Sequence, residues 1–360
     1  MADERKRILK MVEDGMLSAE EALKLLESLE RDRNVEPNST DTSLSVDVDW
    51  ENAEQSTHKK EAKRPRFSDF VETAIKKIKD VDFDFNFGTS YAVNHIFQQK
   101  DVDLKSIYVD IANGSVKCMP WDEQDVRIEC DVQVFKARDE EHAREEFLKD
   151  ARFTVEGERM YFSMQRKTIK VQTVLYIPRS HYEKINIRTF NGQVSGEKLE
   201  VKSLQAKTAN GAIRFARIQG TDIELEAANG KVMLEHSQAK DLDIETLNGR
   251  IVTHGSYEKV DLKSFSGNIE CTLTDSNSRS IFLNTKTGSI DVFVPKNIEV
   301  HGTLKSNLGR FGCYLENIST MNETKDVVQK EMKFTTNDGS EHSLQLEAEA
   351  KAGSVFVKHR

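Results

Sequence analysis

The chain of 360 residues is 37% hydrophobic and 31% charged, so its apolar content suits a narrow repeat array better than a large globular core. Its formal net charge of −9 gives no reason to expect nucleic acid as a partner. The first residues lack the apolar segment of a secretory signal peptide, and no run of apolar residues is long enough to span a membrane. We therefore expect a cytoplasmic protein.

Residues 1–31 are predicted to form a short helical hairpin. Gly15 ends the first helix, and Ser18-Ala19-Glu20-Glu21 has the pattern of a capping box that begins the second. Leu23 and Leu26 lie on the apolar face of that second helix. Two helices this short cannot bury such a face alone. We therefore expect it to dock on a partner, on a second copy of the chain to form a homo-oligomer, or on the rest of the chain.

Residues 32–66 are polar and of mixed charge, which predicts a flexible linker. The linker ends in a basic run at 59–66 that either contacts anionic lipid peripherally or is simply solvated. Residues 67–104 are predicted to hold an amphipathic helix at 67–79 and a capping strand, because apolar residues alternate from Val81 to Phe87. The helix either caps the open end of the following domain or lies on a membrane surface.

Residues 105–360 contain a repeat of about 19 to 21 residues. One glycine per repeat serves as a marker, and asparagine precedes it in several copies. The seven central markers are Gly192, Gly211, Gly230, Gly249, Gly267, Gly288 and Gly309, with outlying copies at Gly114 and Gly353. Fixed positions around each marker are apolar, and the position three before it is small, for example Thr189, Thr208, Ala227 and Thr246.

The repeat predicts a mainly β fold, a single-stranded β-solenoid. Asn and Gly tolerate positive φ, so the chain can turn at each marker while the same face stays buried. Stacked coils would continue each apolar column and align the asparagines into a ladder of side-chain amides. A meander of antiparallel hairpins is the alternative. Between the outlying first copy and the regular part, we expect a strand from Val126 to Val134, a short helix from Asp139 to Phe147 inserted between coils, and a strand from Val171 to Ile177.

No catalytic or metal-binding motif stands out, and no cofactor is expected. Cys118, Cys271 and Cys313 lie four residues after a marker, and Cys130 falls on the apolar phase of its strand, so all four are predicted to be inert core thiols. The nine histidines are scattered. The pairs Glu224/Glu226 and Asp243/Glu245 could imitate a glycosidase dyad, but they occupy the solvent phase of their strands, where charge is expected.

One outward column of the predicted solenoid is apolar. It lies two residues before each marker and becomes polar at Lys286 and Asn307. An apolar stripe on a repeat surface is typical of a binding site, although local packing at the corner is the alternative. The candidate partner-binding residues are Leu23, Leu26, Phe190, Ala209, Ala228, Leu247 and Phe265.

The helical motif GMLSAEEALKLLESLE, followed by a linker and Asn-Gly repeats, resembles the YvlB/LiaX-type proteins of Gram-positive bacteria. The N-terminal motif is similar to their short two-helix domain, and the C-terminal part looks like their adhesin-type β-repeat domain, shared with LiaG-like proteins. The resemblance implies a role in the response to cell-envelope stress, including cationic antimicrobial peptides and membrane-active antibiotics. It implies as partners either a membrane-associated stress protein of the phage-shock type or an envelope-active peptide. It carries no catalytic residues over.

Three functions remain open from the sequence. The first is a non-enzymatic binding or scaffold protein of the envelope-stress response. The second is a carbohydrate-active β-helix enzyme, and the third is a self-assembling structural or adhesin-like protein.

Overall fold

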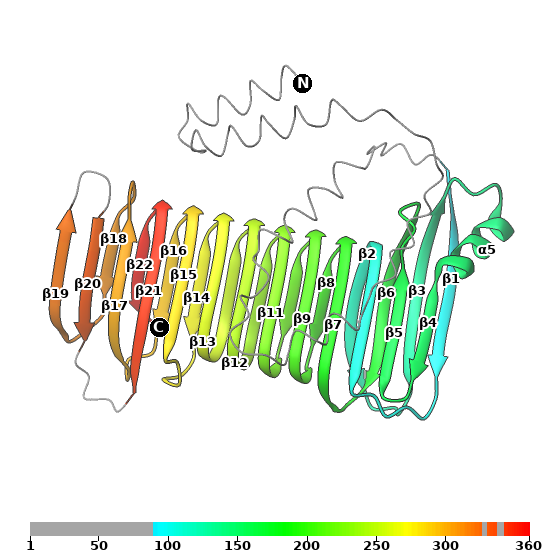
Figure 1. Ribbon diagram of the computed structural model, residues 1–360, viewed down its shortest axis with the longest axis horizontal. Helices are drawn as coiled ribbons and strands as arrows, with labels where there is room; N and C mark the ends of the chain where they lie inside the picture. The colour runs from blue at the N-terminus through cyan, green and yellow to red at the C-terminus, as the bar shows by residue number, and fades with distance from the viewer. Residues whose placement is uncertain (1–88, 326–329, 337–341) are drawn as a thin grey trace, which may run out of the picture. The chain divides into compact units, whose positions relative to one another are not determined.

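The computed structural model describes residues 89–325, 330–336 and 342–360, all within the unit Pro65–Arg360. The predicted hairpin at 1–31, the linker at 32–66, the helix at 67–79 and the strand from Val81 to Phe87 lie outside the described residues. The rest is a stack of β-coils (Figure 1). Each coil contributes a longer strand to one face and a shorter strand to the other, and the two meet at the marker glycine.

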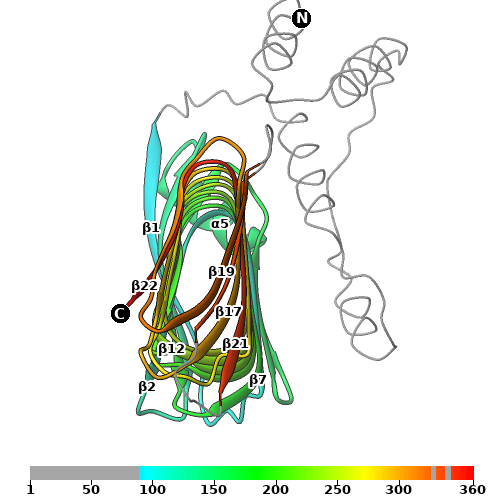
Figure 2. The same ribbon diagram turned by 90° about the vertical axis from the view of Figure 1, so that its left-hand side faces the viewer.

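The two faces lie on opposite sides of the core, with β7, β17 and β21 on one side and β1 and β22 on the other (Figure 2). In stacking order, the long face consists of β4 (Arg152–Glu156), β5 (Arg159–Met164), the first half of β2 (Ser106–Trp121), β7 (His181–Asn191), β9 (Glu200–Asn210), β11 (Gln219–Asn229), the second halves of β12 (Val232–Asn248) and β13 (Ile251–Ser266), β15 (Ser280–Thr287), β21 (Ser343–Ala352), β17 (Glu299–Ser306), β20 (Lys330–Thr336) and β19 (Ile318–Lys325).

The short face follows the same order of coils. It consists of β1 (Ser90–Gln99), β3 (Val126–Phe135), β6 (Ile169–Pro178), the second half of β2, β8 (Val194–Glu197), β10 (Ile213–Ala216), the first halves of β12 and β13, β14 (Ile269–Leu273), β16 (Ile290–Val294), β22 (Val355–His359) and β18 (Phe311–Tyr314). Neighbouring coils pair in parallel, which confirms the predicted solenoid and excludes the meander of antiparallel hairpins.

The core runs through the middle of the stack as continuous columns. Ile187, Ala206, Leu225 and Ile244 are Cα partners in successive coils and are fully buried. Polar and charged side chains alternate with the core residues along β9 and β11 and face outward. The period-two pattern therefore separates a dry interior from a polar exterior in every coil.

The corner of each coil explains the marker glycine. A Cβ on Gly211 would lie 1.9 Å from the carbonyl oxygen of Gly192 in the neighbouring coil, far closer than any side-chain atom can approach. Gly230 also has a φ of +159°, which L side chains rarely adopt. The requirement for glycine at the markers therefore comes first from backbone stacking and only in part from φ.

Two side-chain ladders hold this corner together. The predicted asparagine ladder is present: Nδ2 of Asn210, Asn229 and Asn248 each donates to Oδ1 of the asparagine one coil earlier, at 2.9 to 3.0 Å. The small column at position three before the marker adds a second ladder, in which hydroxyls donate to the glycine carbonyl of the preceding coil in the stack, from Thr189, Thr208, Thr246, Ser264, Thr285 and Ser306. Ala227 has no hydroxyl to offer.

The order of coils in the stack differs from the order in the sequence at both ends. The final copy, with Gly353, lies between the coils of Gly288 and Gly309 rather than at the end. The first copy, with Gly114, lies between the coil of β5 and β6 and the coil of Gly192. The outermost coils then pair with antiparallel strands, which cover edges that would otherwise stay open.

The helix predicted at Asp139 to Phe147 is confirmed as α5 (Glu140–Asp150), with Asp139 as its N-cap. The expectation that it is inserted between coils is wrong. The helix covers the N-terminal end of the stack, against β1 and β3. Buried Phe147 reaches into a cluster of rings there, 5.7 Å from His95 and 6.1 Å from Phe97 between ring centroids. The helix seals the core because an open end would expose these rings to water.

Candidate functional site

The outward side of the long face carries the strongest concentration of charge that we find on the described coils. Three outward positions on each of β11, β12 and the second half of β13 form a regular array, because their strands are paired in register. We call this array the acidic grid, and it consists of Asp222, Glu224, Glu226, Asp241, Asp243, Glu245, Lys259, Asp261 and Lys263. Seven of these nine positions carry carboxylates, several directly opposite one another, an arrangement that is unfavourable unless cations compensate it.

Lys207 from β9 supplies part of that compensation. Its Nζ lies 2.8 Å from Oε1 of Glu224 and 2.8 Å from Oε1 of Glu226. Burial lowers the pKa of Lys207, but the attraction of the two carboxylates outweighs this effect and raises it. The ammonium group therefore stays charged and bridges one edge of the grid.

The two carboxylates beside Lys207 titrate differently. Burial, helped by the neighbouring Glu224, raises the pKa of Glu226 to about 7. Burial also acts to raise the pKa of Glu224, but its contacts with Glu226 and Lys207 hold it below its ordinary value. Glu226 is thus the carboxyl group of this edge that changes charge near neutral pH.

A second lysine serves the opposite side of the grid. Nζ of Lys263 lies 2.7 Å from Oδ2 of Asp261 and 3.5 Å from Oε1 of Glu245. Burial and the charge of Asp243 raise the pKa of Glu245, although Lys263 opposes them. Each lysine is therefore shared between two carboxylates, and the grid keeps an excess of negative charge.

The predicted apolar column borders the acidic grid. We call Phe190, Ala209, Ala228, Leu247 and Phe265 the corner column, and none of them belongs to the hydrophobic core cluster. Their exposure varies: Ala209 and Ala228 are buried, Phe190 and Leu247 are half-buried, and Phe265 is 42% exposed. A cation lies next to the last member of the column: Nζ of Lys286 is 4.6 Å from the ring centroid of Phe265. Leu23 and Leu26 lie outside the described residues.

The acid pairs weighed as a glycosidase dyad have other partners. Glu224 and Glu226 share Lys207, and Glu245 pairs with Lys263. A retaining or inverting glycosidase needs two carboxyl groups facing a bound sugar across a cleft. Neither of the two pockets described below is lined by these carboxylates.

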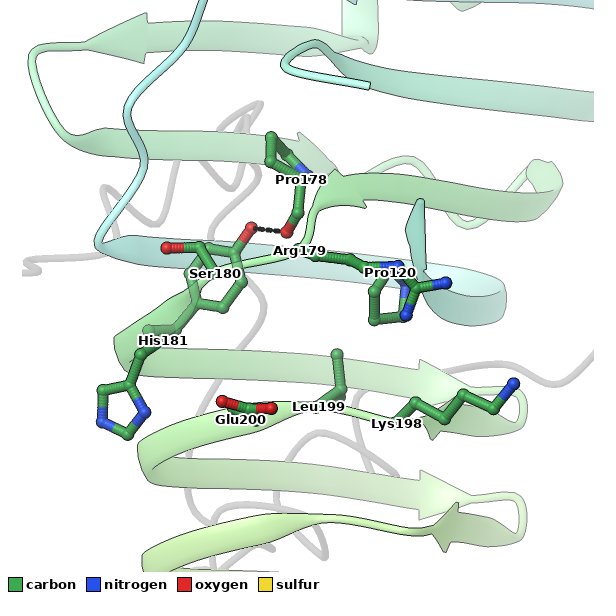
Figure 3. Close-up of a pocket in the computed structure, with 9 residues that line it drawn as sticks. Pro120, Pro178, Arg179, Ser180, His181, Lys198, Leu199 and Glu200 are labelled. Carbon is green, nitrogen blue, oxygen red and sulfur yellow. Dashed lines mark hydrogen bonds between the residues drawn. The ribbon is translucent and has the colours of Figure 1, made fainter. Parts of the chain in front are cut away.

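The first pocket has a volume of about 200 Å³ and lies where the chain passes from one coil to the next (Figure 3). Pro120, Pro178 and Leu199 form much of its wall, and the buried Tyr182 donates a 2.7 Å hydrogen bond to the Pro178 carbonyl. His181 and Glu200 stand at exposed positions of paired strands. The hydroxyl of Tyr182 is therefore held by a backbone carbonyl and not by a side-chain base.

The second pocket, of about 460 Å³, is lined mostly by small polar side chains around Gln238, Lys240 and Asn277. In the described ranges, no group of three histidine, cysteine, aspartate or glutamate side chains is placed to hold a metal ion. No helix in the described part of the chain is long and apolar enough to cross a membrane.

The cysteines follow the prediction with one exception. Cys118, Cys130 and Cys271 are buried, and burial raises the pKa of Cys118 to about 12 and that of Cys271 to about 11. Cys313 is only partly buried, because β18 is the last of the described strands of the short face and pairs there with β22 alone. Burial still raises its pKa, so the thiol stays protonated at neutral pH.

Sequence reasoning missed the polar network that crosses the coils. Nδ2 of Asn186 donates to Oε1 of Gln205 at 3.2 Å, and Nε2 of Gln205 donates to Oε2 of Glu224 at 3.0 Å. These residues occupy equivalent positions, each six residues before its marker glycine. The sequence contains a signal for this network, because the spacing from the marker glycines that aligns the apolar columns also aligns these polar side chains.

Comparisons with known proteins fit this fold. Residues 101–339 match the family model described as Toastrack DUF4097, and residues 3–34 match a SHOCT-like domain. The uncharacterized protein YvlB of Bacillus subtilis (strain 168) is 47% identical over 363 residues, covering 100% of this chain and 99% of that protein.

Two solved structures are similar at low identity. The "putative cell adhesion protein" of Clostridium sporogenes is 11% identical, covers 75% of this chain and 100% of its own, and has a TM-score of 0.27. The "putative adhesin" of Bacteroides fragilis is 12% identical, covers 74% and 97%, and has a TM-score of 0.38. The family model and the full-length relative decide the assignment: the chain belongs to the Toastrack DUF4097 family.

Proposed function

We propose that this protein is a non-enzymatic scaffold of the bacterial cell-envelope stress response, and that the outward side of its long face binds a partner. The observation that carries the proposal is the juxtaposition of the corner column and the acidic grid on one face of a rigid sheet. An apolar stripe beside a charged array suits recognition of an amphipathic partner. The resemblance described above supplies the envelope-stress context.

In this proposal the protein is cytoplasmic and meets the membrane peripherally. Residues 1–31, with Leu23 and Leu26, dock a membrane-associated protein of the phage-shock type or join copies of the chain. An envelope-active peptide is the alternative partner. The long face then presents side chains at the same spacing in coil after coil, which suits a scaffold.

Fractionation tests the proposal. Cells are grown with and without a membrane-active antibiotic, and the protein is quantified in soluble and membrane fractions. We expect the antibiotic to move protein to the membrane fraction, and we expect the double variant Phe190→Ser/Phe265→Ser to reduce the movement. Phe356→Ser, on the opposite short face, is the matched control. A protein that never enters the membrane fraction and binds no envelope component contradicts the proposal.

The carbohydrate-active alternative predicts a different result. If Glu224 and Glu226 formed a catalytic pair, the purified protein would release reducing ends from bacterial wall polysaccharides, and Glu224→Gln would abolish the release. We expect no release by either protein, because both carboxylates are engaged by Lys207.

A further inference from the structure

The pocket of about 460 Å³ lies away from the marker glycines, at the other corner of the coils, where the chain passes from the short face to the long face. It extends from Gly220 in β11 through Ser256 in β13 to Ser343 in β21. On the long face β11 and β21 are four strand spacings apart, roughly 19 Å at about 4.8 Å each. The pocket therefore has the size of a site for a small organic molecule.

Small residues on the long face create part of this hollow. Gly220 pairs with Val201 of the preceding coil, and Ala239 pairs with Tyr257 of the following coil. Gly220 and Ala239 hold equivalent positions, because the residues just before them, at 219 and 238, are Cα partners. Two consecutive coils thus carry little or no side chain where the coils on either side carry a larger one.

A longer loop forms the wall on the far side of the hollow. Gly255 pairs with Leu273, and Lys259 pairs with Ser280. Between these paired positions β13 has three residues, whereas the following coil has six, at 274–279. The additional residues cannot fit into the stack, so they project from the corner.

Backbone and side-chain contacts fix this loop at 274–279. The N–H of Arg279 donates to the Glu258 carbonyl at 2.8 Å. Ser278 is only 1% exposed, and its hydroxyl donates to the Tyr257 carbonyl. The wall is therefore held in place before any ligand arrives, which lowers the entropic cost of binding.

Several polar side chains around the pocket are available to a ligand. The following lining residues make no side-chain hydrogen bond or ion pair in the described ranges: Gln238, Lys240, Ser256, Glu258, Ser276 and Arg279. Lys240 and Arg279 belong to the coils on either side of β13, which contributes Ser256 and Glu258 between them. Two of these groups are cations and one is an anion, so the pocket attracts a ligand with negative charge.

The mixture of donors and acceptors narrows the chemistry of that ligand. Lys240 and Arg279 only donate hydrogen bonds, so they suit a carboxylate or a phosphate. The carboxylate of Glu258 only accepts, so it needs a ligand with hydroxyl donors and disfavours one that is anionic throughout. Ser256 and Gln238 both donate and accept, as hydroxyl groups of a ligand do. The residues that line the pocket include no aromatic ring, so binding depends on polar contacts.

We infer that this pocket binds a polyhydroxylated anion, a sugar or polyol that carries a carboxylate or a phosphate. The anionic group contacts Lys240 and Arg279, and the hydroxyl groups bond to Glu258, Ser256 and Gln238. The inference goes beyond the proposed function, because the pocket and the partner-binding face consist of different residues. It involves binding without hydrolysis, since Glu258 is the one carboxylate of the lining and a glycosidase needs two.

Isothermal titration calorimetry of the full chain tests the inference. The acidic probes are trigalacturonate, which carries carboxylates, and glucose-6-phosphate. Maltotriose has hydroxyl groups without charge, and inorganic phosphate has charge without a sugar. The variant Lys240→Gln/Arg279→Gln removes both cations at exposed positions, and Lys100→Gln/Arg152→Gln removes the same charge at exposed positions beside β1 and in β4.

We expect at least one acidic probe to bind the wild type and the control variant equally, and to bind Lys240→Gln/Arg279→Gln at least about tenfold more weakly. We expect maltotriose and inorganic phosphate to bind the wild type at least about tenfold more weakly than that probe. The comparison of probes needs no variant, so it decides the matter even if the variant unfolds.

Three results would overturn the inference: neither acidic probe binds, the two double variants bind equally well, or inorganic phosphate binds as tightly as the acidic probe. The acidic probe that binds identifies the charged group as a carboxylate or a phosphate. Since the titration uses purified protein and a different site, its outcome is independent of the fractionation result.

Discussion

The middle coils and the end coils of this solenoid are stabilised in different ways. In the middle, from β7 to β16, the coils share parallel pairing and stacked glycines, and most of them add a hydroxyl or an amide to the side-chain ladders. At the ends, antiparallel strands and one helix with a cluster of aromatic rings take over. The middle depends on residue identity at recurring positions, whereas the ends depend on a few large side chains and on topology.

The largest effect is expected from a methyl group in the glycine stack. Gly211→Ala places Cβ 1.9 Å from the Gly192 carbonyl oxygen, so two coils must separate. We expect a loss of more than about 4 kcal/mol in the free energy of unfolding, measured by chemical denaturation. Gly157→Ala is the control, since it has a φ of +57° and no atom within 4 Å, and it should cost about 1 kcal/mol. Equal losses of stability in Gly211→Ala and Gly157→Ala would show that backbone φ, and not the stacking of coils, requires glycine at the markers.

The N-terminal end should respond strongly but locally. Phe147→Ala removes a fully buried ring from the aromatic cluster and should cost about 3 to 5 kcal/mol. Hydrogen exchange should accelerate in β1 and β3 and remain slow in β11 and β12. The neighbouring Leu148→Ala, 42% exposed, should change little. Uniform acceleration along the stack would contradict the separation of end and middle.

Glu226 should make the middle coils less stable as the pH rises. Its pKa is about 7 in the fold and near its ordinary value when unfolded, so between roughly pH 4.5 and 7 the unfolded chain releases the proton first. Stability should therefore fall by about 2 to 3 kcal/mol across that window. Glu226→Gln should flatten the profile, as measured by thermal melts at pH 5 and pH 7.5. If the stability of Glu226→Gln depended on pH as strongly as that of the wild type, a group other than Glu226 would be responsible.

The asparagine ladder should contribute moderately. Asn229→Ala removes the bond that Asn229 donates to Asn210 and the bond that it accepts from Asn248, both on the surface. We expect a loss of about 1 kcal/mol in a denaturation experiment. Ser266→Ala, in the same column beyond the asparagines, should cost less than about 0.5 kcal/mol. A similar cost at both positions would mean that the ladder adds nothing specific.

The smallest effect should be a gain. Ala227 is a member of the small column without a hydroxyl, whereas Ser264 and Ser306 donate to glycine carbonyls from equivalent positions. Ala227→Ser should therefore add a hydrogen bond to the Gly211 carbonyl and stabilise the fold by about 0.5 to 1 kcal/mol. A loss of stability would show that this coil has no room for the oxygen.

Much of the middle could be predicted from the sequence, because the marker glycines set the register of every column. That register placed Ile187 and Leu225 in the core, Asn210 and Asn229 in a ladder, and Phe265 at the outer corner. It could also have placed Glu224 beside Lys207, since the two lie in neighbouring coils within reach of a lysine side chain.

The ends could not be predicted in the same way. A period shows which residues are equivalent but not which coils are neighbours, so the position of Gly353 inside the stack has no local signal. Cys313 occupies a core position, yet it is half-exposed because β18 is the outermost strand of the short face among the residues that the structure describes. The buried Ala209 and Ala228 within an outward column likewise depend on surroundings that alternation does not describe.

The displaced final coil has a consequence for synthesis. A ribosome completes β17 and β18 well before β21 and β22, yet β21 lies between β15 and β17 in the finished stack. The outer coil can pair with β20 on its outer side, but its inner neighbour is missing until β21 and β22 emerge, and that layer must then insert beneath it. Loss of the C-terminus would remove an interior layer of this protein rather than trim its edge.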